Sequence, residues 1–346
     1  PGEPLPRWKL ACYWRLDNQP IWNEPKWLAD ISKDYGIDHK AAEKFTNELA
    51  QELNIDSNLA LPAYEDPFYF IWEESKIPTN VDPLKVDLKS PLERQKLAEL
   101  LNDGLDIPVA YSIPIRWDTD CSSWQSCQWQ FRRNHLFLIP GNSPAGLRLP
   151  LESIQDVEKE PKEFERDRFA EEEVLASGET IYNDQTQSGD NNTSAEIFKT
   201  CLVIEVRQGK LFVFFPPVML LEHYLGLVTA VEHVASRLGI PVLIEGYDPP
   251  SDNRLQKFMI TPDPGVIEVN IHPSTTWREL LNNYETLYTC ARESRLTTEK
   301  FNLDGRHTGT GGGNHVTLGG LKPADSPLLR RPDVLKSFIT YWQHHP

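Results

Sequence analysis

The sequence has few of the features that mark a secreted, membrane-spanning or nucleic-acid-binding protein. Its cysteines number five, without a CxxC pair, which favours a reducing compartment over a disulfide framework or a zinc site. No signal-peptide pattern and no apolar run of about 18 residues is present. Lys and Arg number 35 against 51 Asp and Glu, too few for non-specific binding to nucleic acid or anionic lipid. We therefore expect a cytoplasmic protein without nucleic-acid or membrane partners.

The 346 residues are 39% hydrophobic and 10% aromatic. A chain of this length and composition predicts one large folded body with a second lobe or a large insertion. Its tryptophans favour core and inter-lobe packing, and a peptide-binding groove is the alternative. The chain starts at Pro1 without a methionine and stops at Pro346 directly after a helical pattern. We expect it to be an internal piece of a longer protein.

Changes in composition predict three regions. Residues 1–153 are rich in Trp and Pro and indicate a mixed α/β accessory region, with helices at 38–53 and 91–102 and a strand at Leu136 that breaks into a Gly/Pro loop. Residues 154–196 are charged and then polar, which predicts a partly disordered linker. Residues 197–346 show regular apolar patterns and form the predicted catalytic region.

The pattern of the third region predicts an α+β fold. A hairpin at 200–207 and 210–215 precedes a helix at 221–237 that Gly239 would cap. A strand at 241–247 and a strand pair at 258–261 and 265–271 follow. Helices at 275–295, capped by Ser274 or Thr275, and at 333–345 complete the region. We expect a sheet with helices on one side.

The glycine-rich segment 304–320 is the sharpest local signal for function. Glycines alternate there with Thr, Asn, Arg306 and two histidines, His307 and His315. Such a loop exposes backbone amides to phosphate oxygens, and its side chains can hold a metal or phosphate. It lacks the Gly-Lys-Ser/Thr of P-loop proteins. A flexible surface turn is the alternative.

A polar strand face is the second signal. Alternation along the strand after Gly265 places Glu268, Asn270 and His272 on one face. We interpret Glu268 as a metal ligand, with a surface carboxylate as the alternative. For His272, a hydrogen-bonding role at the helix entry competes with a catalytic one.

Acidic residues also interrupt apolar strands at Glu205 and Glu245, which is costly unless they are paired or bound to a cation. Glu205 could pair with Arg207, and Glu245 is the better candidate ligand. Such oxygen ligands suit Mg²⁺ or Mn²⁺ carrying ATP phosphates. Arg148 could hold a substrate carboxylate or phosphate, or form a salt bridge that stabilises the fold.

Four segments together resemble a known family. They are the start at 1–8, Pro-Gly-Asn-Ser-Pro at 140–144, the strand at 263–273 and the loop at 306–315. Across essentially the whole chain, the sequence resembles the large bacterial amidoligase family, whose members are often fused to a transglutaminase-like domain or encoded beside one. That family belongs to the glutamine synthetase superfamily, whose curved antiparallel sheet carries glutamates that bind two or three Mg²⁺ or Mn²⁺ ions around ATP.

The resemblance implies roles for individual residues. Gly265 to Glu268 matches the superfamily's Gly-x-x-Glu metal strand, and 309–317 matches its Gly-x-Gly, His-x-Ser loop. The expected metal ligands are Glu245, Glu268 and His315, and the expected catalytic residues are Arg306 and His315. The expected ATP contacts are Thr308, Gly309, Thr310, Gly311, Gly312, Gly313, Asn314 and Thr317. Gly313 occupies the position of a second family histidine, so the metal role falls to His315 or His307.

The resemblance implies an ATP-dependent carboxylate-amine ligase that forms an amide through an acyl phosphate, with a peptide or protein as a candidate carboxylate substrate. Phosphotransfer to a guanidino nitrogen and a non-catalytic nucleotide- or peptide-binding module are the alternatives. Two family strands, one before and one after these residues, are absent from the sequence. We therefore expect an incomplete glutamine-synthetase-like sheet that is inactive alone.

Overall fold

A computed structural model describes residues 9–66, 69, 75, 107–131, 135–154, 174–186, 193–263, 266–308, 315, 317–320 and 323–345. The chain forms two compact units. The larger unit comprises residues 21–163 and 176–250, and the smaller unit comprises 1–20, 164–175 and 251–346. The helix predicted at 91–102 lies outside the described residues.

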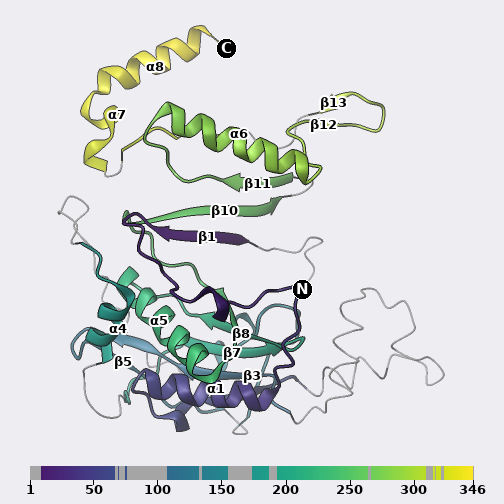
Figure 1. Ribbon diagram of the computed structural model, residues 1–346, viewed down its shortest axis with the longest axis vertical. Helices are drawn as coiled ribbons and strands as arrows, with labels where there is room; N and C mark the ends of the chain where they lie inside the picture. The colour runs from purple at the N-terminus through teal and green to yellow at the C-terminus, as the bar shows by residue number, and fades with distance from the viewer. Residues whose placement is uncertain are drawn as a thin grey trace. The chain divides into compact units, whose positions relative to one another are not determined.

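A six-stranded mixed sheet organises the larger unit (Figure 1). Its order is β6-β2-β3-β7-β8-β9. The strands are β2 (Leu61–Tyr64), β3 (Ala110–Pro114), β6 (Leu136–Phe137), β7 (Cys201–Arg207), β8 (Lys210–Phe215) and β9 (Val242–Gly246). A separate two-stranded sheet joins β4 (Arg116–Asp118) to β5 (Ser123–Gln125).

Helices α1 (His39–Glu52) and α5 (Leu221–Leu238) lie together beside this sheet (Figure 1). Asp38 caps α1 by accepting the amide of Ala41, and Gly239 ends α5 in the left-handed conformation that glycine favours. The predictions for both helices are confirmed. A third helix, α4 (Gly178–Thr186), packs against α5.

Each face of the sheet has its own hydrophobic core. Ile204 pairs with Val213, and both lie in the core shared with α1 and α5. Their neighbours Val203 and Phe214 pair on the opposite face, in a second core formed with side chains of 127–154. Because side chains alternate along a strand, the continuous apolar runs of β7 and β8 reflect burial on both faces.

A three-stranded antiparallel sheet, β1-β10-β11, organises the smaller unit. Its strands are β1 (Leu10–Arg15), β10 (Leu255–Asp263) and β11 (Val266–Asn270). Helix α6 (Trp277–Glu293) runs alongside β11 in Figure 1. Its cap is Thr276, whose hydroxyl accepts the Glu279 amide, rather than the predicted Ser274 or Thr275. Thr275 instead donates to the Glu279 carboxylate, which completes a reciprocal capping arrangement.

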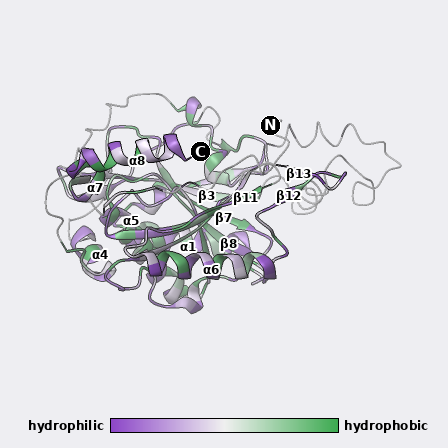
Figure 2. Ribbon diagram, turned by 90° about the horizontal axis from the view of Figure 1, so that it is seen from above, coloured by the Kyte–Doolittle hydropathy of each residue, from purple (hydrophilic) through white to green (hydrophobic). Residues whose placement is uncertain are grey.

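The remaining elements of the smaller unit are short or exposed. They are the hairpin β12 (Lys300–Phe301) and β13 (His307–Thr308), the 3-10 helix η5 (Pro323–Asp325), and the helices α7 (Pro327–Arg330) and α8 (Pro332–His344). Hydrophobic and hydrophilic residues alternate along α8 (Figure 2). Among the described residues, no helix has the length and apolar character needed to cross a membrane.

The fold confirms the broad class and corrects the expected direction of two strands. The chain is a mixed α+β protein, but the antiparallel pattern is wrong at both edges of the large sheet, where β6 and β9 run parallel to their neighbours. Helix α5 connects β8 to β9 as a crossover, which parallel pairing requires.

The large sheet also joins β3 to β7, so strands from 1–153 and 197–346 share one sheet. Helix α4 lies within 154–196, the region expected to be a linker.

Candidate functional site

Glu268 lies on β11 with its side chain exposed to solvent. It pairs with Thr261 of β10, whose hydroxyl lies 3.5 Å from one carboxylate oxygen. Asn270, two residues along the strand, is also exposed and lies on the same face. Glu268 therefore combines an open carboxylate with a backbone that the β-ladder fixes, an arrangement suited to binding a cation.

His272 does not extend that polar face. Its Nε2 accepts a hydrogen bond of 3.2 Å from the Asn283 amide on α6, and its ring meets Trp14 edge-on at 5.0 Å. On β10, Trp14 pairs with Gln256 and Glu268 pairs with Thr261. The positions of Gln256 and Thr261 differ by an odd number, so their side chains lie on opposite faces of the sheet. Trp14 and Glu268 therefore lie on opposite faces as well. The regular strand ends at Asn270, before the alternation reaches His272. The prediction of one shared face is wrong for His272, which hydrogen-bonds to Asn283 of α6 instead.

The glycine-rich segment is described at its edges. Arg306 is 86% exposed, and its Nε lies 3.6 Å from Asp304 Oδ2. His307 and Thr308 form β13. His315 and Thr317 are exposed. The predicted nucleotide contacts Gly309, Thr310, Gly311, Gly312, Gly313 and Asn314 lie outside the described residues.

In the larger unit, Glu245 of β9 is engaged by a guanidinium. Arg207 Nη2 contacts Glu245 Oε2, and Arg207 Nε lies 3.5 Å from Glu205 Oε2. Burial raises the pKa of Glu245, and the charge of Arg207 opposes that rise. Glu245 Oε1 is buried without a hydrogen-bond partner. A metal ion at Glu245 would have to compete with Arg207 for the carboxylate.

Glu205 and Arg148 have structural partners. Glu205 accepts the Ala145 backbone N–H at 2.9 Å. Arg148 and Glu65 form a bidentate salt bridge in which both side chains are only 3% exposed, and Arg148 Nε donates to the Ile139 carbonyl. The salt-bridge alternative for Arg148 is confirmed.

A second titratable cluster joins α1, α4 and α5, and sequence reasoning did not identify it. His233 places Nδ1 3.0 Å from Glu52 Oε1 and Nε2 2.9 Å from Glu179 Oε1. Tyr182 and Arg237 also donate to Glu52, at 2.8 Å each. The available signal was the matched i, i+4 spacing of Glu48 with Glu52 and of His233 with Arg237.

This cluster shifts the pKa values of its members, among them Glu52 and His233. Burial alone would raise the pKa of Glu52, but hydrogen bonds from His233, Tyr182 and Arg237 lower it to about 2. The bond to Glu52 is the main reason that the pKa of His233 rises to about 9. The charged partners are side chains of α1, α4 and α5, so the cluster connects these three helices.

Among the described residues, no group of three or more His, Cys, Asp or Glu side chains could hold a metal ion. Glu268 fits a hard cation as a single ligand, and Glu245 is already paired with Arg207. The part of the chain that the structure describes therefore holds no preformed metal centre with three or more such ligands.

Comparison with known proteins identifies a family. A family model described as "Putative amidoligase enzyme" matches residues 1–346. No curated protein and no solved structure matches the chain.

Proposed function

Since the chain belongs to this amidoligase family, we propose that it carries part of an ATP-dependent carboxylate-amine ligase. The carboxylate attacks the γ-phosphorus of ATP, which forms an acyl phosphate and releases ADP. An amine then attacks the acyl carbon, so that the C–N bond forms while the C–O bond to phosphate breaks, and the amine proton leaves with inorganic phosphate or water. The match of the family model to every residue of the chain carries this proposal.

Glu268 is the residue we assign to cation binding in this reaction. Its carboxylate is exposed on an ordered strand and makes one long polar contact, to Thr261. Mg²⁺ bound there would neutralise charge on the ATP phosphates. A glutamine-synthetase-like arrangement of the sheet belongs to the same proposal, and the antiparallel β1-β10-β11 sheet supports it.

Arg306 and His315 are the residues we assign to the phosphate groups. Both are exposed, and in the chain they precede and follow residues 309–314. A guanidinium can donate to two phosphate oxygens at once, and an imidazole can donate to a third. These contacts would orient the γ-phosphate for attack and stabilise the charge that develops during transfer.

The test uses the native protein with ATP, Mg²⁺ and a mixture of peptides as carboxylates. Hydroxylamine serves as the amine, because it converts an acyl phosphate into a hydroxamate that is easily measured. The proposal predicts ADP release together with hydroxamate formation. Phosphorylated product without hydroxamate would indicate phosphotransfer instead and would contradict the ligase.

One observation favours a non-catalytic binding module as a second candidate. The described residues bring together no group of three potential metal ligands, whereas enzymes that transfer phosphoryl groups commonly use bound metal ions. Calorimetric titration of the native protein with ATP and Mg²⁺ separates the candidates. The ligase requires saturable nucleotide binding, and its absence would favour the module.

A further inference from the structure

A cavity of about 420 Å³ opens at one edge of the six-stranded sheet, in the larger unit. Leu61 and Pro62 at the start of β2 and Leu136 of β6 form one part of its wall. The segment 128–131 forms a second part of the described wall. Strand β6 is the edge strand of the sheet, next to β2. The volume lies within the range of pockets that bind small molecules.

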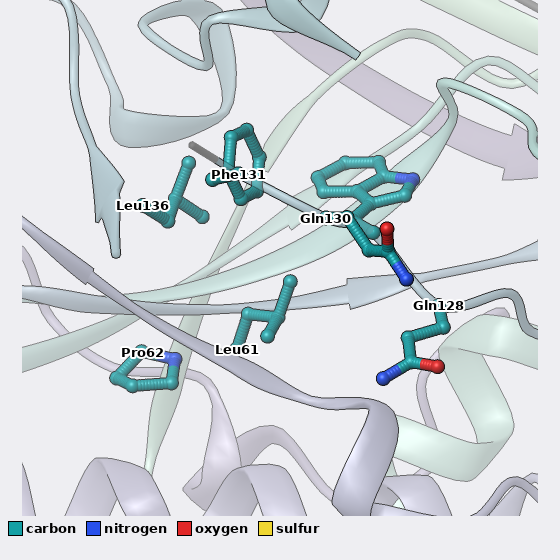
Figure 3. A pocket seen from close by; sticks show the side chains of 7 residues that line it. Leu61, Pro62, Gln128, Gln130, Phe131 and Leu136 are labelled. Carbon is teal, nitrogen blue, oxygen red and sulfur yellow. The ribbon is translucent and has the colours of Figure 1, made fainter. Parts of the chain in front are cut away.

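The cavity has an apolar side and an amide side (Figure 3). Leu61, Pro62, Phe131 and Leu136 lie on one side, and the carboxamides of Gln128 and Gln130 lie on the other. None of the described lining residues carries a charge. The described lining is therefore neutral, although the net charge of the protein is −16.

The wall is anchored to the sheet and its second core. Trp129, between the two glutamines, is 3% exposed and donates its indole N–H to the Phe198 carbonyl at 2.8 Å. Leu136 is buried and pairs with Ala63 in the β-ladder. The residues that carry the carboxamides and the apolar wall are thus held before any ligand arrives, which reduces the entropy cost of binding.

The described lining favours an uncharged ligand. Among the described lining residues, a carboxylate or phosphate entering the cavity would meet no counterion to offset its lost hydration. Each glutamine carboxamide offers two N–H donors and one carbonyl acceptor, which complement the C=O and N–H of an amide. The opposite wall offers hydrocarbon and aromatic surface to an apolar group.

We propose that this cavity binds a neutral peptide unit that carries an apolar side chain, with the backbone amide against Gln128 and Gln130 and the side chain against Leu61 and Phe131. This inference is independent of the proposed ligase activity. It predicts binding even in the absence of ATP or a metal ion.

The test titrates the intact chain with N-acetyl-phenylalaninamide and, as a charged analogue, with N-acetyl-phenylalanine, and follows binding by calorimetry. The variant is the double substitution Gln128→Leu and Gln130→Leu, which removes both carboxamides from exposed positions. The control is Gln51→Leu, at an exposed position on α1 outside the cavity. Thermal unfolding of each variant verifies the fold.

We expect the amide to bind saturably and the carboxylate analogue to bind more weakly. Loss of hydrogen bonds in the double variant should weaken amide binding about threefold to tenfold, while Gln51→Leu leaves it unchanged. The proposal is overturned by the absence of saturable binding of the amide. Equal binding by the folded double variant, or equal binding of the carboxylate analogue, would also overturn it.

Discussion

The two units differ in how they use charged side chains. In the larger unit, Arg148 and Glu65 are buried against each other, and His233 and Glu52 connect helices. In the smaller unit, Glu268 and Arg306, which carry the proposed chemistry, face solvent. The hydrophobic cores show the same contrast, because the core residues belong almost entirely to the larger unit and α6 and α8 have no buried residues.

This contrast separates stability from function. Removing one member of a buried ion pair destabilises the fold, because the other charge is left without a counterion in a low-dielectric interior. Replacing an exposed charged residue changes the free energy of unfolding little, because solvent already screens its charge. Such a residue is available to bind a ligand. Substitutions of charged residues in the larger unit should therefore lower the free energy of unfolding most, and those in the smaller unit should mainly affect ligand binding.

The largest expected effect comes from Arg148→Ala. The substitution leaves Glu65 buried without its cation and should lower the free energy of unfolding by about 3–5 kcal/mol. Arg306→Ala, at an exposed position, should cost about 0.5 kcal/mol or less. Urea unfolding of both variants measures the difference, and equal losses would refute the contrast between the units.

A smaller effect is expected from Gly209→Ala. Gly209 has φ +68°, and an added Cβ would lie 1.7 Å from the Asp34 carboxylate, which holds the Gly36 amide. The combined backbone strain and displaced carboxylate should cost roughly 2–3 kcal/mol.

Gly305→Ala is the matched control in the smaller unit, because Gly305 also has positive φ but has nothing within 4 Å of the added Cβ. The strain alone should cost about 1 kcal/mol. Thermal unfolding should therefore show a larger decrease for Gly209→Ala, and the reverse order would contradict the packing described around Asp34.

The sequence predicted local structure well and long-range partners poorly. Apolar periodicity located α1, α5 and the β7–β8 hairpin, and Gly239 marked the end of α5. These features depend on neighbours within a few residues. The pairing of β3 with β7 joins segments separated by a long stretch of chain, so no local pattern specifies it.

The candidate site shows the same limit. Alternation predicted correctly that Glu268 and Asn270 share a face, but it failed for His272, where the strand had already ended. Arg148 could be assigned either role from sequence, because its partner Glu65 lies 83 residues away. The Arg207 contact to Glu245 likewise depends on the order β7-β8-β9, which the sequence alone does not specify.

The smallest expected effect is a pH dependence from His233. Its pKa is about 9 in the folded protein against 6.5 for the ordinary group. Because the folded pKa is raised, the stabilisation is complete below pH 6.5 and is lost as pH rises through about 9. The loss should be on the order of 1 kcal/mol after allowance for solvent screening.

Urea unfolding at pH 6 and pH 9.5 measures this loss in the wild type and in His233→Gln. The variant lacks the titrating group, so it should show a smaller change in unfolding free energy between the two pH values. An identical change in both proteins would contradict the assigned role of the connection between His233 and Glu52.

The central claim is tested most directly by measuring the affinity for ATP with Mg²⁺ of the wild-type protein and of two glutamate variants. Glu268→Gln removes the charge of the proposed ligand, and Glu285→Gln removes an exposed charge on α6 of the same unit. Calorimetry should show about 10–100-fold weaker nucleotide binding for Glu268→Gln and wild-type affinity for Glu285→Gln. Equal affinities in the two variants would contradict the assignment of Glu268 to the nucleotide site.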